Sequence, residues 1–245
     1  KVITATGSIE RPMIFDNNDR PGIFLSSAIK RYSDFFGVAC GEKNILFTNN
    51  DSAYETAISL IQKGINIEAI IDNREEVDSK LTYEVEKNNI KIYKGHTVTN
   101  TSGYKRINKV TIMQLSKDGQ KVVGSKINLS CDCLGVSGGW TPAVHLFTQS
   151  GGKLKFRDED QVFIPDKYPS DQISIGSCNG DFTLDEILSS IPNKLKDFLN
   201  IKKTDYENLE VYSSFNKSKR NIWLLPSDKL IGKTKPFVDY QNDAT

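Results

Sequence analysis

The chain has 245 residues, of which 26% are charged and 38% hydrophobic, and its formal net charge is +1. This length allows one large domain or two small ones, each with a proper core. Such a balance of charge gives no electrostatic case for nucleic acid or a membrane surface as the main partner. No apolar run approaches the roughly 20 residues that a membrane span needs. We therefore expect neither nucleic acid nor membrane among its partners.

The first elements expected are a short strand over residues 2–5 and, after the turn-forming residues 16–22, a helix over 23–36. A β-α-β unit follows, with strands over 44–48 and 65–72 and a helix over 53–63. Both strands are almost entirely apolar, as strands buried on both faces of a parallel sheet are. The sequence therefore predicts a parallel sheet in this part of the chain.

The pattern then changes. A helix over 78–88 and a strand over 90–93 precede three alternating segments, 96–100, 107–115 and 121–128, which predict an antiparallel meander. Further along, strands are expected at 131–135 and 172–175, and a helix at 184–191. The fold class expected is therefore α/β, with a Rossmann-like parallel unit followed by a small meander.

The four cysteines are Cys40, Cys131, Cys133 and Cys178. The C-D-C spacing of the middle pair is too tight for a usual zinc site. Residues i and i+2 of a strand share a face, so both thiols of this pair are expected to point the same way. We interpret the cysteines as buried or half-buried free thiols of a protein kept in a reducing cytoplasm.

A dinucleotide site in a β-α-β unit normally uses a G-x-G-x-x-G loop, whose glycines let the backbone approach the pyrophosphate. Here the loop reads T-N-N-D-S-A-Y, without glycine. A carboxylate such as Asp51 about 4 Å from a phosphate would cost about 4 kcal/mol at an effective dielectric constant of about 20. The simpler interpretation makes Asp51 or Ser52 the N-cap of the helix. Asp72 stands where a ribose-binding acid would, which is weak support without the glycines.

Thr6-Gly7 and Gly176-Ser177 follow two apolar strands. In doubly wound sheets ligands gather at the carboxyl edge, and glycine there permits close backbone approach to a ligand. Ordinary tight turns explain these glycines equally well. His145 has apolar neighbours and is expected in a core or interface. No catalytic residue and no metal ligand is predicted.

Five ordered motifs resemble one family, the alpha subunit of heterotetrameric sarcosine oxidase. They read A-T-G-S-I-E-R-P, F-D-N-N-D-R-P-G-I, T-N-N-D-S-A-Y, C-D-C-L-G-V-S-G-G-W-T-P-A-V-H-L-F-T-Q-S-G-G-K and K-P-F-V-D-Y-Q-N-D-A-T. Related subunits of opine oxidase and cyanide synthase share the early motifs. No methionine precedes the first strand, which in such flavoproteins lies inside the chain, so the chain is expected to be a fragment of a larger subunit.

The resemblance implies a glutathione-reductase-type fold with two dinucleotide-binding domains, the first of them incomplete here. The parent complex would oxidatively demethylate sarcosine to glycine with oxygen, forming hydrogen peroxide, and pass the one-carbon unit to tetrahydrofolate. Its cofactors would be NAD in the alpha subunit, FMN shared with beta, and FAD in beta. Its partners would be the beta, gamma and delta subunits, and its location the cytoplasm.

By the same resemblance, residues 1–21 and 129–192 are the remnant of the first dinucleotide-binding domain. Residues 22–128 are the inserted NAD(P)-binding-like domain with its meander, and 193–245 are a linker toward an aminomethyltransferase-like region. Thr6, Gly7, Gly176 and Ser177 would lie nearest a bound dinucleotide, although Ser177 stands where many relatives of the wider fold have an acidic residue.

The chain by itself is then expected to be inactive and to bind no cofactor. Three alternatives stay open. The first is a subunit of a related opine oxidase or cyanide synthase. The second is a complete NAD(P)H-dependent reductase domain, against which the missing glycine motif argues. The third is a non-catalytic interaction module whose nucleotide pocket has decayed.

Overall fold

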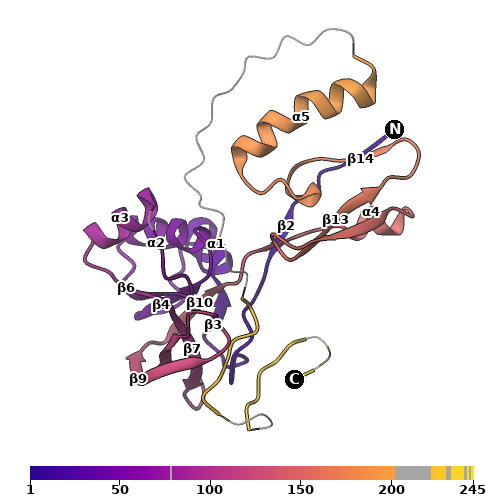
Figure 1. Ribbon diagram of the computed structural model, residues 1–245. Helices are drawn as coiled ribbons and strands as arrows, with labels where there is room; N and C mark the ends of the chain where they lie inside the picture. The colour runs from indigo at the N-terminus through magenta and orange to yellow at the C-terminus, as the bar shows by residue number, and fades with distance from the viewer. Residues whose placement is uncertain (78, 202–221, 230–232, 240–241, 243) are drawn as a thin grey trace. The chain divides into compact units, whose positions relative to one another are not determined.

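A computed structural model of the chain describes residues 1–77, 79–201, 222–229, 233–239, 242 and 244–245 (Figure 1). Within these residues the chain forms two compact units. Unit 1 comprises Lys1–Glu10 with residues 140–201, and unit 2 comprises Arg11–Gly139 with the described part of residues 222–245.

Unit 2 is built on a parallel sheet of five strands in the order β3-β10-β4-β5-β6. Their bounds are Ile23–Leu25, Cys133–Ser137, Asn44–Thr48, Ile67–Asp72 and Lys91–Lys94. Three helices connect the strands: α1 (Ser26–Phe36), α2 (Ser52–Gln62) and α3 (Lys80–Lys87). The predicted parallel unit and the α/β class are thereby confirmed.

An antiparallel meander, β7-β8-β9, follows the parallel strands as predicted. Its strands are His96–Ser102, Lys109–Leu115 and Val122–Ser130. Figure 1 shows the helices on one side of the parallel sheet and the meander on the other. The sheet is therefore the middle of three layers, which explains why its strands are apolar on both faces.

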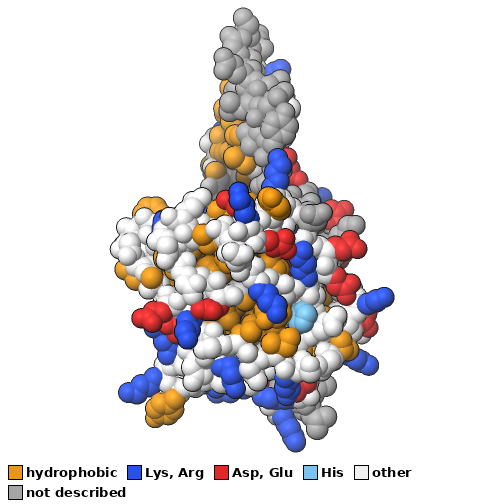
Figure 2. Space-filling view, turned by 90° about the vertical axis from the view of Figure 1, so that its left-hand side faces the viewer, with side chains coloured by type: hydrophobic (Ala, Val, Ile, Leu, Met, Phe, Trp, Pro, Cys, Tyr) orange, Lys and Arg blue, Asp and Glu red, His pale blue; other side chains and the backbone are white. Residues whose placement is uncertain are grey.

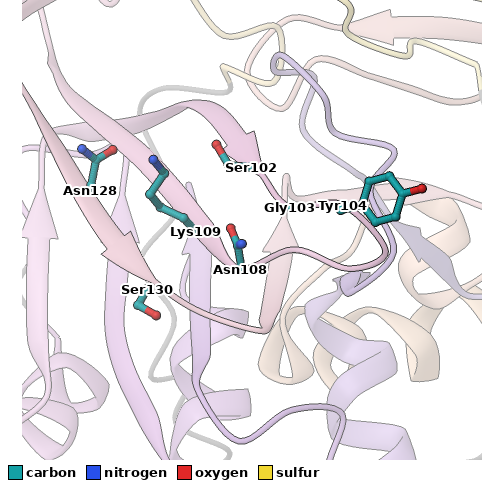
Figure 3. Close-up of a pocket in the computed structure, with 7 residues that line it drawn as sticks. All are labelled: Ser102, Gly103, Tyr104, Asn108, Lys109, Asn128 and Ser130. Carbon is teal, nitrogen blue, oxygen red and sulfur yellow. The ribbon is translucent and has the colours of Figure 1, made fainter.

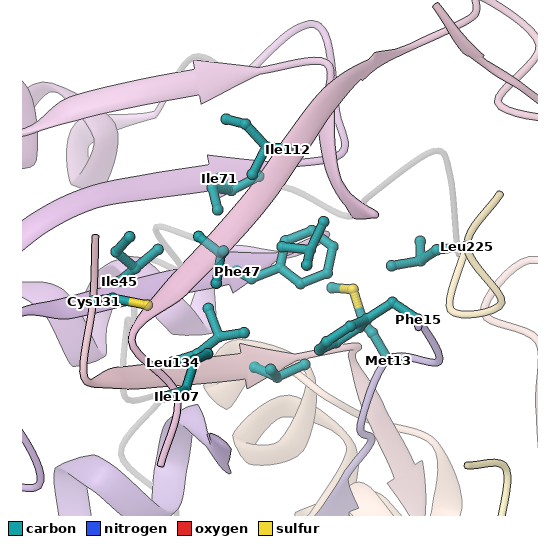
Figure 4. Close-up of a cluster of buried hydrophobic side chains, with 13 residues drawn as sticks. Met13, Phe15, Ile45, Phe47, Ile71, Ile107, Ile112, Cys131, Leu134 and Leu225 are labelled. Atoms are coloured by element: carbon teal, nitrogen blue, oxygen red, sulfur yellow. The ribbon is translucent and has the colours of Figure 1, made fainter. Parts of the chain in front are cut away.

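The two faces of this sheet bury separate hydrophobic clusters. Ile45, Phe47 and Ile71 belong to the cluster beneath the meander, drawn in Figure 4. Leu46 and Ile70 belong to the cluster beneath the helices. The alternation follows from the strand geometry, in which successive side chains point to opposite faces.

Unit 1 contains three two-stranded sheets. They are the parallel pair β1 (Val2–Thr4) and β14 (Gln172–Ser174), the antiparallel pair β2 (Ser8–Glu10) and β11 (Trp140–Pro142), and the hairpin β12 (Lys153–Arg157) and β13 (Val162–Lys167). Its helices are α4 (His145–Gln149), the 3₁₀ turn η1 (Gly176–Asn179) and α5 (Leu184–Leu199). Large apolar side chains stay exposed on this unit, among them Val2, Ile9, Leu146 and Phe163.

The structure divides the chain at different residues from those predicted. Strand β10 lies between β3 and β4 of unit 2, although residues 129–192 were assigned to the other domain. Its register pairs Leu134 with both Ile23 and Ile45, so β10 is an interior strand of that sheet with a partner on each side. The boundary therefore falls after Gly139.

Two further elements differ from the predictions. The stretch 23–36 begins as strand β3 and becomes helical only at Ser26, because three consecutive apolar residues fit either period. The last helix runs on through Pro192 to Leu199, into the predicted linker 193–245. The later residues 222–229 and 233–239 of that linker contact unit 2 instead of standing apart, as their hydrogen bonds show.

The cysteines are free thiols, three of them buried and Cys40 half-buried, as predicted. The expectation that Cys131 and Cys133 point the same way is wrong, because they lie in the two clusters on opposite faces of the sheet. The chain bends at Asp132, whose carboxylate accepts the amides of Glu42 and Lys43 at 3.0 and 2.8 Å. That bend ends the period-two alternation just before β10 starts.

Thiol reactivity should follow this burial. Desolvation raises the pKa of Cys131 to about 12, and it also raises those of Cys133 and Cys40. We expect a thiolate-directed alkylating reagent to modify Cys40 slowly and the buried thiols hardly at all, until denaturant exposes all four. Peptide mapping by mass spectrometry measures this, with Cys40→Ser as the control. Rapid labelling of Cys131 in the folded chain would contradict the structure.

Opposite charges are spread over the surface, as the small net charge suggests. Figure 2 shows lysine, arginine and acidic side chains interspersed over one face. Within the described ranges, no helix is both long enough and apolar enough to cross a bilayer.

Candidate functional site

The four predicted binding residues lie at one edge of unit 1. Strand β1 pairs with β14 in parallel, with Thr4 opposite Ser174. Both strands therefore end at the same edge, and Thr6-Gly7 and Gly176-Ser177 each begin two residues further on. The structure thus brings together two segments that are about 170 residues apart in the sequence.

Hydrogen bonds hold this edge in place. The Thr4 and Ser174 hydroxyls are 2.7 Å apart, and the amide of Ile175 donates to the carbonyl of Thr4 at 3.0 Å. Just beyond, the Thr6 hydroxyl donates to the carbonyl of Ala143 at 2.6 Å. Because a hydroxyl also carries acceptor lone pairs, Thr6 can still receive a hydrogen bond from a ligand.

Both glycines of this edge adopt the left-handed conformation. The φ angle is +76° at Gly7 and +72° at Gly176, a region that side chains with a Cβ avoid. A Cβ built at either position would meet no atom within 4 Å. Tight packing within the chain therefore does not explain these glycines, and the space beside them is open to a ligand.

The corresponding edge of unit 2 is built differently. In the loop between β4 and α2, the side-chain oxygen of Asn50 accepts the amide and the hydroxyl of Ser52 at 3.0 and 2.5 Å. Asp51 occupies the N-cap position, but its side chain makes no capping hydrogen bond. Asp51 is therefore the N-cap by position, one of the two residues predicted for it, but the side chain of Asn50 accepts the donors at the start of the helix.

The carboxylate of Asp51 belongs to a buried cluster of charged side chains. Its carboxylate lies 2.8 Å from Nη1 of Arg74, whose Nη2 lies 2.8 Å from the carboxylate of Asp72. The hydroxyl of Tyr54 donates to Asp72 at 2.9 Å. The Arg74 side chain is 7% exposed and both carboxylates 0%. Asp72 is thus a partner of arginine and is not available to a ribose.

Sequence reasoning missed Arg74. It stands two residues after the strand-ending Asp72, and two acids near one loop should have prompted a search for a cation. Burial opposes its charge, but the hydrogen bonds and charges of Asp72 and Asp51 raise the pKa of Arg74. Burial also opposes the charge of Asp72, and it therefore raises the pKa of this carboxyl, although the hydrogen bonds from Arg74 and Tyr54 act in the other direction.

The stability of unit 2 should depend on pH through the buried phenol of Tyr54. Burial, and next the charge of Asp72, raise the pKa of this phenol above its usual 10.0. Since the folded unit holds the proton more tightly, its stability should fall as the pH rises above about 10. Tyr54→Phe should flatten this alkaline slope and cost about 1.5–3 kcal/mol at neutral pH, because a hydrogen bond to a carboxylate is lost. Urea unfolding across pH measures both effects. Tyr104→Phe, which removes an exposed phenol, should change neither.

A hollow of about 760 Å³ lies on the meander, apart from the predicted binding residues. Figure 3 shows its lining: Ser102, Gly103, Tyr104, Asn108, Lys109, Asn128 and Ser130. Lys109 is its one charged side chain, and it holds none of the predicted binding residues. His145, predicted to be in a core or interface, is exposed at the start of α4. Among the described residues, no three or more His, Cys, Asp or Glu side chains are grouped to hold a metal ion.

The curated proteins to which the chain is similar share one name, sarcosine oxidase subunit alpha. The chain is 32% identical over its whole length to sarcosine oxidase subunit alpha of Corynebacterium sp. (strain P-1). It is 26% identical over 99% of its length to the subunit of the same name from Rhizobium meliloti (strain 1021). The chain spans about a quarter of the length of these relatives, 26% and 23%. No protein-family model matches it.

Solved structures agree on the fold. Thioredoxin reductase of T. acidophilum matches 82% of this chain and 64% of its own, at a TM-score of 0.60 and 17% identity. L-proline dehydrogenase of P. horikoshii matches 81% of this chain and 34% of its own chain, at a TM-score of 0.56 and 22% sequence identity. Along its whole length, then, this chain resembles one segment of the alpha subunits of sarcosine oxidase, and its fold is the Rossmann-like, glutathione-reductase-type α/β fold of these two solved enzymes.

Proposed function

We propose that this chain is a central portion of the alpha subunit of a sarcosine-oxidase-type complex, where it scaffolds dinucleotide and flavin cofactors. The similarity to the curated alpha subunits over the whole chain is the observation that carries the proposal. The complex oxidises the N-methyl group of sarcosine with oxygen, releasing glycine and hydrogen peroxide. The one-carbon unit passes to tetrahydrofolate, and the partners are beta, gamma and delta subunits in the cytoplasm.

Unit 1 is the part of the chain that fits a dinucleotide. The left-handed Gly7 and Gly176 stand at one carboxyl edge, where a Cβ would meet open space. Thr6 and Ser177 add hydroxyl groups beside them. In this proposal unit 1 is the remaining part of the domain that holds NAD, and these residues line one side of its site. FMN lies at the border with the beta subunit, and FAD lies within beta.

Unit 2 does not fit a dinucleotide in the same way. Its loop lacks glycine, and the buried carboxylates of Asp51 and Asp72 lie beneath the edge where a pyrophosphate would bind. Arg74, the cation of that cluster, is already bonded to both acids. In this proposal unit 2 is the second domain of the fold, retained for its structure.

Calorimetry with NAD tests the proposal, on this chain and on the complete alpha subunit that carries it. We expect binding by the complete subunit and none by the chain, because in this proposal unit 1 supplies only one side of the NAD site. Amine oxidation should require the whole complex. Binding by neither polypeptide would favour a non-catalytic interaction module. Steady turnover of NAD(P)H by the chain alone would favour a reductase and overturn the proposal.

A further inference from the structure

A later segment of the chain contacts the edge of unit 2 where this fold receives its ligands. In open α/β sheets, ligands bind beyond the carboxyl ends of the strands where the strand order reverses. In unit 2 that place is between β4 and β10, because β5 and β6 follow on one side and β3 lies on the other. Here Nδ2 of Asn49 lies 3.4 Å from the carbonyl of Gly138 and 3.2 Å from the carbonyl of Ile222. The backbone of Ile222, far along the chain, thus contacts this edge.

Residues 222–225 are built into unit 2 and do not merely lie on its surface. The amide of Ile14 donates to the carbonyl of Trp223 at 2.6 Å, and the amide of Leu225 donates to the carbonyl of Ile14 at 2.9 Å. Leu225 is 8% exposed and lies in the buried cluster beside Phe15 (Figure 4). The ring of Trp223 lies 4.5 Å from the guanidinium of Arg11, which adds a cation–π contact.

A second anchor holds the residues that follow. Asp16 and Asn18 are 3% and 2% exposed, yet both turn their side chains to the backbone of residues 233–239. Asp16 accepts the amide of Lys235 at 2.7 Å and forms an ion pair with Lys229. Asn18 accepts the amide of Phe237 at 2.7 Å and donates to its carbonyl at 2.9 Å.

These contacts give a structural role to two sequence motifs that have no part in the proposed dinucleotide site. F-D-N-N-D-R-P-G-I contains Asp16 and Asn18, and K-P-F-V-D contains Lys235 and Phe237. A buried polar side chain is costly unless its hydrogen bonds are satisfied, so residues of this kind at these positions are matched to the backbone that they bind. The two motifs are therefore complementary halves of one contact.

We propose that the carboxyl edge of unit 2, together with the turn at residues 16–18, is an internal docking site whose ligand is the chain's own segments 222–229 and 233–239. This segment occupies the place of a dinucleotide and fixes the path of the chain across unit 2. The buried acids beneath the edge disfavour an anionic ligand and leave the site to a peptide. This proposal does not depend on whether unit 1 takes part in binding a cofactor.

Hydrogen–deuterium exchange of the full chain tests the docking. Asn18→Ala should speed exchange at the amides of Leu225 and Phe237 by about tenfold or more, because Asn18 makes two hydrogen bonds to Phe237. The amides of β4 and β5 should stay protected and report an intact sheet. Asn88→Ala, which removes an exposed hydrogen bond to Glu84, is the matched control. Unchanged exchange at Phe237 in Asn18→Ala would overturn the proposal.

Two further measurements keep the outcome decisive. Asn18→Ala could also unfold the parallel sheet, and a second variant covers that case. Ile14 and Leu224 are β-bridge partners, so the double variant Ile14→Cys with Leu224→Cys should form a disulfide on mild oxidation. The amides of β4 should stay protected in that variant. Failure to cross-link would count against docking. Millimolar NAD, NADP or FAD should leave the exchange of residues 222–237 unchanged. Displacement of the segment by any of the three would show that the edge still serves a nucleotide.

Discussion

Arg74→Ala should lower the free energy of unfolding of unit 2 by about 3–5 kcal/mol. The substitution leaves Asp51 and Asp72 buried beside each other without their shared cation. Breaking a buried ion pair on one side is far more costly than the pair's net contribution, because the remaining charge has neither water nor a partner. The whole carboxyl edge, including the loop before α2, should become less ordered.

The loss should also depend on pH in a definite direction. Burial already raises the pKa of Asp72, and without Arg74 the carboxyl should hold a proton still more readily. A group whose folded pKa is raised favours the folded state at low pH, so the damage should ease as the pH falls toward the acidic range. Urea unfolding at several pH values, followed by exchange of β4 and β5 amides, measures both effects.

An exposed ion pair provides the control. Lys63 and Asp34 pair on the surface with side chains 37% and 34% exposed, so Lys63→Ala should cost only about 0–1 kcal/mol. A double variant, Asp51→Asn with Arg74→Met, should recover part of the loss, since it removes one buried charge of each sign. Equal losses for Arg74→Ala and Lys63→Ala would show that the buried cluster is not what stabilises this edge.

The sequence predicted best where the signal is local. Strands β4 and β5 are continuous apolar runs, and helix α2 follows a loop of capping residues, so neighbouring side chains alone define them. The meander was found for the same reason, since alternation and turn residues lie within a short window. Strand β3 was mistaken for the start of a helix because Ile23–Leu25 fits both periods.

What sequence reasoning missed are contacts that only the folded chain brings together. Arg74 pairs with Asp51 of the loop before α2, and Asn18 bonds to the backbone of Phe237, more than 200 residues away. A hydrogen bond from a side chain to a distant backbone leaves no periodic pattern in the sequence. The division of the chain failed for a related reason, because only strand pairing shows that β10 lies between β3 and β4.

The four residues of unit 1 remain a prediction about binding. The structure places Thr6, Gly7, Gly176 and Ser177 beyond the ends of two paired strands, which the apolar runs before them suggested. The two glycines among them offer the sharpest test of this prediction.

Gly7→Ala and Gly176→Ala, made in the complete alpha subunit, should weaken binding of NAD by at least about tenfold, or about 1.4 kcal/mol. Each added methyl would occupy the open space beside the backbone, where a ligand of this fold makes its closest approach. Each should also cost about 1–2 kcal/mol in stability, because L-residues are strained at positive φ. Calorimetry with NAD and thermal unfolding separate the two effects.

Gly151→Ala is the matched control within the same unit. Its φ is +92° and a Cβ there also meets nothing within 4 Å, so the strain is of the same kind. It stands before β12, in the turn after α4, whose Ser150 contacts Gln172 at the start of β14, the end opposite to the carboxyl edge. It should therefore lower stability while leaving NAD affinity unchanged. If all three variants bind NAD as the unaltered subunit does, the glycines serve only their turns, and the dinucleotide lies elsewhere.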